Sequence, residues 1–511
     1  MDRGELELGE TAQSYGAIAL WTGLSFAALA LGLRLTSFKV PVFDGDEYAF
    51  ALVARDVLHG HLPNTGVFDN KPVGLTYLFA LAEALGGQTV FALRALGLAG
   101  STACAALLFV SSRRLGLGRG GALMIAALFM LGALCLGGFT TLSELLACPL
   151  LAAANALLVS ERRSPIALLA IGAALGLACQ VTYLAAPCAI LTVAGGVVIG
   201  RRQAFTQRLR DAALMAVGGA VAALAVWTPQ LIAGGWGAYL ADQLRYHQGY
   251  RLAAFRWGDW MAGFGLPVAA LGFPIAALGL LRLQPDPGAA PGGRAKTPPL
   301  FWIIGLQGLG AVLAATASNR FYPHYLLLAL PADAVMTALL LAAPAGPHRR
   351  AGWRVLTAIL LLSAALSFAL LLSRLKAPRV ELQAATVADR LTRPGQSLFV
   401  FDEAPAIYYL AKRPAAGRYI FPSHYLSTCD HAPAIVAPAT VLAGALAQQP
   451  ALVLVGALCP PESDAAPAIL KAGYRRVEVL QTGPRRIIFY APRDPGAAPA
   501  RLSPPGAAAT P

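Results

Sequence analysis

The sequence predicts a polytopic α-helical membrane protein with a small α/β domain at its C-terminal end. Charged residues make up 13% of the 511 residues, about half of their share in an average soluble protein. The mean hydropathy is +0.60. Apolar runs long enough to cross a bilayer recur through the first 375 residues. Together these observations exclude a disordered chain and an ordinary water-soluble enzyme.

The apolar runs correspond to about eleven membrane-spanning helices, because a bilayer core of roughly 30 Å requires about 20 helical residues. The predicted spans are 15–35, 90–112, 121–139, 142–160, 165–182, 184–200, 212–233, 259–281, 300–317, 324–344 and 355–374. The division between 165 and 200 stays open, since Pro187 lies within a nearly continuous apolar run.

The formal net charge of +14 does not indicate a nucleic-acid-binding protein, because the basic residues lie in short clusters between apolar runs. With a cytoplasmic N-terminus, these clusters fall in the loops predicted to lie inside the cell, which is the positive-inside distribution. The loops are 113–119, 161–163, 201–210, 282–296 and 348–354. The high alanine, arginine and glycine content suits a bacterium. We therefore predict a multi-pass protein of a bacterial inner membrane with a periplasmic C-terminal domain.

Three segments predicted to lie outside, 36–89, 234–258 and everything after 375, are too long to be simple turns. In the last of them, strand-like runs at 397–401, 451–458, 475–480 and 485–490 alternate with helical stretches at 381–391, 403–412, 440–448 and 464–472. This alternation predicts an α/β domain. We expect a membrane domain over 1–375, a periplasmic domain over 376–493 and a disordered, Pro- and Ala-rich tail over 494–511.

Cys429 and Cys459 are the two cysteines of the predicted periplasmic domain. An oxidising compartment permits a disulfide between them, which would stabilise the domain by roughly 3–4 kcal/mol in the chain-entropy model. The alternative is a pair of unpaired buried thiols.

The first outside segment carries three carboxylates within four residues: Asp44, Asp46 and Glu47. A helix-like run follows them, so either aspartate is a suitable N-cap. Carboxylates at a bilayer edge are costly to bury, and their clustering also suits a general base. The three side chains offer oxygen ligands to a divalent metal ion, and the sequence leaves metal dependence open.

Further along the same segment, Asp69 and Lys71 lie in the sequence FDNKP before an amphipathic helix. Lys71 can stabilise a departing phosphate, and its alternative role is that of an interfacial anchor. Asp69 can accept hydrogen bonds from hydroxyl groups, and its alternative is a turn residue.

These motifs resemble the first periplasmic loop of the GT-C glycosyltransferases, especially family 39, which includes the protein O-mannosyltransferases and the lipid A aminoarabinose transferases. The matching positions here are Asp46-Glu47, Ala54-Arg55 with Gly60, and Lys71-Pro72, whereas Val73 replaces a second proline. The sequence SNRFYPHYLLLALPA (318–332) resembles a second family motif through Arg320, His324, Tyr325 and Pro331. Arg94 fits an F-A-x-R stretch and is expected to orient the amphipathic helix.

The resemblance implies an inverting transfer of a sugar from a polyprenyl-phosphate donor to a periplasmic acceptor. Asp46 is implied as the general base, with Glu47 as its substitute or positioning partner. Lys71, Arg320 and His324 are the expected donor-phosphate contacts. Further substrate contacts of lower rank are Asp69, Arg55, Tyr325 and Arg245, although Arg55 also suits pairing with a local carboxylate.

The expected partners are the lipid-linked donor, membrane lipids and an acceptor that is lipid A or lipopolysaccharide, another envelope glycan, or a protein. The sequence specifies no certain cofactor. The competing hypothesis is a transporter or flippase of lipid-linked glycans, which usually carries ionisable groups in mid-membrane helices. A third hypothesis is a non-catalytic member whose outer domain recruits partners.

Overall fold

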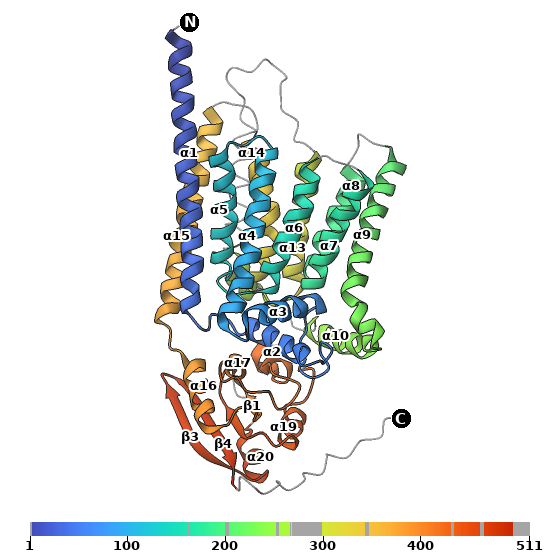
Figure 1. Ribbon diagram of the computed structural model, residues 1–511, viewed down its shortest axis with the longest axis vertical. Helices are drawn as coiled ribbons and strands as arrows, with labels where there is room; N and C mark the ends of the chain where they lie inside the picture. Colours follow the sequence, from blue (N-terminus) through green and yellow to red (C-terminus); the bar gives the residue numbers. More distant parts are fainter. Residues whose placement is uncertain are drawn as a thin grey trace.

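Long helices packed side by side form most of the chain, and a small α/β domain lies against one end of this bundle (Figure 1). The computed structural model describes residues 3–160, 164–199, 204–251, 255–265, 267, 299–342, 347–430, 434–459 and 464–493. The predicted tail over 494–511 lies outside the described residues.

The helices of the bundle follow one another up and down along the chain (Figure 1). They are α1 (Arg3–Thr36), α4 (Val90–Arg114), α5 (Arg119–Cys135), α6 (Ser143–Val159), α7 (Pro165–Val181), α8 (Ala185–Ile199), α9 (Phe205–Ile232), α13 (Pro299–Ala317), the 3₁₀ helix η3 (Pro323–Ala329) with α14 (Leu330–Leu341), and α15 (Pro347–Lys376). Ten of the eleven predicted spans thus coincide with described helices. Most of the eleventh, 259–281, lies outside the described residues.

Among the described segments, six are long and apolar enough to cross a membrane by length and composition. They are α1, α4, α9, α13, η3 with α14, and α15; helices α5 to α8 are shorter but equally apolar. Apolar side chains on the outside of the bundle, such as Ile232 and Leu362, are largely exposed, as expected for side chains that contact lipid. The chain is a multi-pass membrane protein.

Small residues allow the closest helix pair, α7 and α9, to approach backbone to backbone. A Cβ atom on Gly172 would lie 1.8 Å from the carbonyl oxygen of Met215, and one on Gly218 would lie 2.1 Å from that of Leu169. Only glycine fits such a contact, which is the common way for membrane helices to pack tightly.

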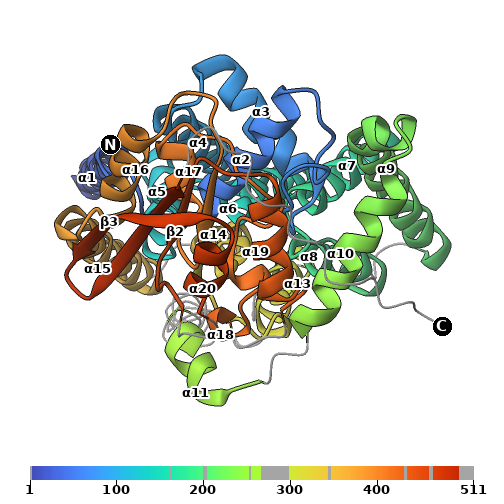
Figure 2. The same cartoon turned by 90° about the horizontal axis from the view of Figure 1, so that it is seen from below.

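The two long loops predicted to lie outside form short helices at the end of the bundle that faces the C-terminal domain (Figures 1 and 2). The first loop contains η1 (Ser37–Lys39), α2 (Asp46–Leu58) and α3 (Val73–Gly86). The second contains α10 (Trp236–Arg251) and the start of α11 (Trp257–Trp260); the π-helical turn η2 (Met261–Gly265) follows, within the predicted span 259–281.

The C-terminal domain contains a four-stranded sheet in the order β1-β2-β4-β3. Strands β1 and β2 are parallel, whereas β4 is antiparallel to both β2 and β3. The elements are α16 (Val380–Leu391), β1 (Leu398–Phe401), α17 (Ala406–Leu410), η4 (Pro422–His424), α18 (Ser427–Asp430), α19 (Pro438–Ala447), β2 (Leu452–Val455), α20 (Ala466–Lys471), β3 (Tyr474–Thr482) and β4 (Arg485–Pro492). All four strands and all four helical stretches predicted from the sequence are present.

Strands β1 and β2 are buried on both faces of the sheet, and one face joins the domain to the membrane bundle. Leu398 and Val400 of β1 belong to the same buried apolar cluster as Tyr48 of α2 and Leu75 of α3. Phe399 and its neighbours on the opposite face form a separate core with α19 and α20. The domain is therefore packed onto α2 and α3.

A disulfide joins Cys429 and Cys459 across 30 residues of the C-terminal domain. We expect Cys459→Ser to lower the free energy of unfolding of this domain by about 2–5 kcal/mol, because the cross-link restricts the unfolded chain. Thermal unfolding of the detergent-solubilised protein, with and without reductant, measures this loss. The control is Cys179→Ser, which removes a free thiol of α7. Equal unfolding temperatures for both variants would contradict the expectation.

Candidate active site

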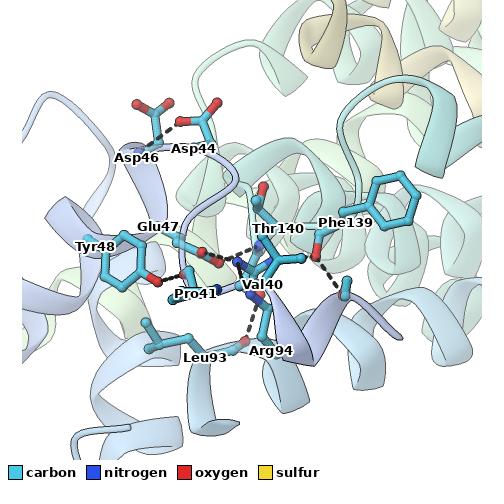
Figure 3. A network of polar contacts seen from close by, with 12 residues as sticks. Val40, Pro41, Asp44, Asp46, Glu47, Tyr48, Leu93, Arg94, Phe139 and Thr140 are labelled. Carbon is cyan, nitrogen blue, oxygen red and sulfur yellow. Dashed lines mark hydrogen bonds and ion pairs between the residues drawn. The ribbon is translucent and has the colours of Figure 1, made fainter. Parts of the chain in front are cut away.

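The site is assembled where α2 begins, between the end of the bundle and the C-terminal domain. Gly45 occupies the N-cap position, and Oδ1 of Asp44 accepts a hydrogen bond of 2.9 Å from the backbone N–H of Asp46, the first residue of α2. Both carboxylates point to the same side of the loop (Figure 3). Because Asp44 accepts from this N–H, the Asp46 carboxylate is not needed for it.

Glu47 points the opposite way, into the protein (Figure 3). Its Oε1 lies 2.7 Å from Nη2 of Arg94, and neither side chain is exposed. Its Oε2 accepts a 3.1 Å hydrogen bond from the backbone N–H of Thr141, and Arg94 donates a 2.6 Å hydrogen bond to the carbonyl of Phe139. Glu47 thus connects α2 to α4 and to the loop before α6.

This arrangement favours Glu47 as a positioning partner over a substitute base beside Asp46, and both roles stay predictions. It also separates the three carboxylates that were candidates for a shared metal ion. Within the described ranges, the one cluster of side chains that meets metal-ligand spacing is Asp402 with Cys429 and Cys459, and those two sulfurs are already joined in the disulfide. Arg94, expected to orient the amphipathic helix α3, instead pairs with α2.

Lys71 reaches the site from the loop before α3 and pairs with a glutamate of the bundle. Its Nζ lies 3.4 Å from Oε1 of Glu144, the second residue of α6. The Lys71 side chain is 12% exposed and the Glu144 side chain 1%. Oε1 of Glu144 also accepts hydrogen bonds from Ser143 at 2.9 Å and Thr182 at 3.2 Å. Glu144 therefore holds the lysine side chain.

Glu144 was not among the candidates chosen from the sequence. The signal that could have found it is a carboxylate at the start of an apolar helix, because a buried charge requires a partner of opposite sign. That partner, Lys71, is 73 residues away in the sequence, so no local motif connects the two.

The charges of the carboxylates near Lys71 change one another's pKa values and that of the lysine. The pKa of Asp46 is raised well above its usual range, first by burial and then by the negative charge of Asp44, while Lys71 opposes the rise. Burial also raises the pKa of Asp69 to about 6. Burial alone would lower the pKa of Lys71, but Glu144 and Asp46 raise it by more. The lysine is therefore charged at neutral pH.

Asp69 is buried, and its backbone is fixed from both sides. Its N–H donates to Oδ1 of Asn64 at 2.9 Å, and its carbonyl accepts hydrogen bonds from Asn64 at 2.8 Å and from Gln243 of α10 at 2.7 Å. Its own Oδ1 accepts from the N–H of Asn70 at 2.7 Å. These contacts fix the loop that precedes Lys71, and the substrate-binding role of Asp69 stays a prediction.

The second sequence motif meets the first at Tyr325. The ring of this tyrosine lies 5.9 Å from Nζ of Lys71, and His324 packs edge-on against it at 4.8 Å. His324 also stacks on Tyr322. Arg320 precedes η3 and lies in a short turn, where its N–H donates to Ser318 at 3.3 Å. The fold thus brings a loop near residue 70 and a helix start near residue 325 to one place.

Two other candidates lie elsewhere. Arg55 is buried on α2 with its guanidinium 5.0 Å from the ring centre of Tyr409, in α17 of the C-terminal domain. Glu83 of α3 is the carboxylate that acts most strongly on Arg55. Arg245 is exposed on α10. The contacts of Arg55 therefore belong to the interface between the bundle and the domain.

No protein-family model matches the chain, and no curated protein does. Among solved structures, it is similar to ArnT from Cupriavidus metallidurans bound to undecaprenyl phosphate, with a TM-score of 0.62 at 14% sequence identity. The match covers 91% of this chain and 97% of that chain. The chain has the GT-C fold. The apo state of the same ArnT gives a TM-score of 0.59 over the same shares of the two chains.

The similarity extends over nearly the whole length of both chains. The fold class predicted from the sequence is therefore confirmed, and the resemblance to GT-C glycosyltransferases holds at the level of the fold. Membership of family 39 stays a prediction. At 14% identity the similarity establishes the fold, and the function is inferred from the site.

Proposed function

We propose that the protein is an integral-membrane glycosyltransferase that uses a polyprenyl-phosphate-linked sugar. The observation that carries this proposal is the carboxylate of Asp46 beside the charged Lys71, at the end of a GT-C bundle. A base and a phosphate-binding cation at a bilayer edge suit a substrate whose reactive bond lies at the membrane surface. The ArnT structure with undecaprenyl phosphate supports a donor of this class.

In the proposed mechanism, Asp46 accepts the proton of an acceptor hydroxyl as its oxygen attacks the anomeric carbon. The bond between that carbon and the phosphate oxygen breaks, and polyprenyl phosphate leaves with the bonding electrons. Lys71 stabilises the negative charge of the phosphate, with Arg320 and His324 as further contacts. The attack comes from the side opposite to the phosphate, so a single displacement inverts the configuration.

The raised pKa of Asp46 has a direct kinetic consequence. Only the deprotonated carboxylate accepts a proton, so kcat/KM rises with pH through this pKa. Asp44 contributes to the raised value through its charge, and Asn at position 44 keeps the oxygen that accepts from the N–H of Asp46. We therefore expect Asp44→Asn to move the acidic limb of the pH profile of kcat/KM to lower pH. An unmoved limb would mean that Asp46 does not titrate in the reaction.

We place the protein in a bacterial inner membrane with a cytoplasmic N-terminus and the site at the periplasmic face. The distribution of basic loops supports this orientation, and so does the position of both long outer loops and the C-terminal domain at one end of the bundle. We further propose that residues 1–375 form the catalytic unit and 376–493 a periplasmic domain. The acceptor class is lipid A or lipopolysaccharide, another envelope glycan, or protein.

The test begins with mass spectrometry of envelope glycans from a deletion strain and from the same strain carrying the wild-type protein. We expect one sugar-sized mass to disappear in the deletion and to return on complementation, and the shifted molecule identifies the acceptor. An unchanged set of glycans would contradict the proposal.

The alternative, a flippase of lipid-linked glycans, would also change the envelope. The purified protein in detergent separates the two functions, because micelles have no second compartment to which a substrate could be moved. Transfer of sugar from a polyprenyl-phosphate donor to the acceptor in detergent supports the glycosyltransferase. Loss of glycan in cells without any transfer in detergent would favour the flippase.

A further inference from the structure

The loop that carries Asp69 and Lys71 is held by parts of the chain that follow it by more than 150 residues. From α10, the side chain of Gln243 donates a hydrogen bond to the carbonyl of Asp69, and the hydroxyl of Tyr239 donates one of 3.0 Å to the carbonyl of Lys71. The backbone of the candidate phosphate-binding residue is thus fixed by α10. Its side chain is held separately by the bundle, through Glu144.

Arg418 of the C-terminal domain connects this loop with α10. Its Nη2 donates a hydrogen bond of 2.8 Å to the carbonyl of Asn64 and forms an ion pair with Asp242. Its own carbonyl accepts a 2.9 Å hydrogen bond from the N–H of Phe68, and its guanidinium lies 5.6 Å from the ring centre of Phe68. Arg418 therefore contacts the loop through both backbone and side chain, one residue before Asp69.

The same domain also packs behind the start of α2. Pro405 lies next to Gly45, with its Cδ 3.7 Å from the position of an added Cβ. The rings of Tyr48 and Tyr409 are 5.4 Å apart. The C-terminal domain thus contacts both loops that supply the site, one beside Asp46 and the other beside Asp69.

From these contacts, we infer that Arg418 is a positioning residue that holds the loop of Asp69 and Lys71 against α10 in the geometry that binds the donor phosphate. Only the expected change in donor KM rests on the proposed function; the contacts of Arg418 with the loop do not. The C-terminal domain is in this view a structural part of the donor site.

Loss of this contact has a specific kinetic signature. When the loop is loose, donor binding must order it, and that cost appears as a higher donor KM. A saturating donor restores the order, so kcat changes less than KM. A merely structural role would instead reduce the fraction of active molecules, which lowers kcat and leaves KM unchanged.

The experiment compares Arg418→Gln with wild type and with a matched control in the full-length protein in detergent. The control is Arg390→Gln, which removes an ion pair with Glu478 within the same domain, away from the loop. We expect Arg418→Gln to raise the donor KM about tenfold, the loss of one charge-assisted hydrogen bond, and Arg390→Gln to leave it unchanged. Arg418→Lys keeps a charge for Asp242 and is expected to recover part of the affinity.

Hydrogen–deuterium exchange provides a readout that does not depend on activity. We expect faster exchange over residues 64–71 in Arg418→Gln than in wild type or in Arg390→Gln. Unchanged exchange in this segment would overturn the inference, and so would a lower kcat at constant donor KM. If wild type transfers no sugar from any polyprenyl-phosphate donor, the proposed function fails, whereas the exchange measurement still decides whether Arg418 holds the loop.

Discussion

Asp46→Asn is expected to reduce kcat by about 10²–10⁴-fold, the contribution typical of a general base. Asparagine has nearly the same size and can keep local hydrogen bonds, but it cannot accept the proton of the acceptor hydroxyl. The donor KM is expected to change little, because the phosphate contacts remain. The measurement is the rate of sugar transfer by purified protein at saturating donor, with equal amounts of folded enzyme.

Asp56→Asn provides the matched control for this substitution. Asp56 lies on the same helix, where it contacts His61 at 2.8 Å and accepts a hydrogen bond from the N–H of Val67. Its removal deletes a carboxylate of α2 without touching the Asp46 carboxylate. A wild-type kcat in Asp46→Asn would show that Asp46 is not the general base. An equal loss in both variants would indicate a defect of α2 rather than of chemistry.

Glu47→Gln is expected to destabilise the fold by about 3–5 kcal/mol, because it leaves the charge of Arg94 buried without its partner. Both side chains are fully buried, so water cannot replace the lost contact. Thermal unfolding of the detergent-solubilised protein measures the loss. The molecules that do fold are expected to keep close to wild-type kcat, since Glu47 points away from Asp46.

The double variant Glu47→Gln with Arg94→Met tests the cause of this destabilisation. Removal of both charges is expected to recover part of the stability, because the remaining cost is then that of lost hydrogen bonds alone. A double variant less stable than either single variant would contradict the ion-pair explanation. A large fall in kcat per folded Glu47→Gln molecule would return Glu47 to the list of candidate bases.

Local sequence pattern was sufficient for the fold class and for part of the site. The apolar runs predicted the bundle, and the alternation of short strands and helices predicted the C-terminal sheet. Each pattern is set by which residues of one local helix or strand are buried, so it can be read from a short stretch of sequence. The residues that meet at the site from the two motifs, Lys71 and Tyr325, were likewise chosen from local sequence. Each motif lies on one short stretch of chain, so its spacing is visible without a structure.

The sequence also contained a reason to separate the roles of Asp46 and Glu47. Successive residues of an α-helix point about 100° apart, so two neighbours at a helix start do not face the same substrate. What sequence reasoning could not supply are contacts between distant segments. Glu144 contacts Lys71, 73 residues away in the sequence, and Arg418 contacts Asn64, 354 residues away.

The hydrogen bond between Glu47 and Thr141 cannot form until the ribosome has synthesised both residues. These residues are 94 positions apart, and translation at about 5–20 residues per second needs roughly 5–20 s to cover that distance. Arg94 is made halfway through this interval, and the N–H of Thr141 completes the contact only at its end. The Arg418 contact comes still later, after 354 further residues beyond Asn64. The candidate site is therefore among the first parts of the chain to be made and among the last to be completed.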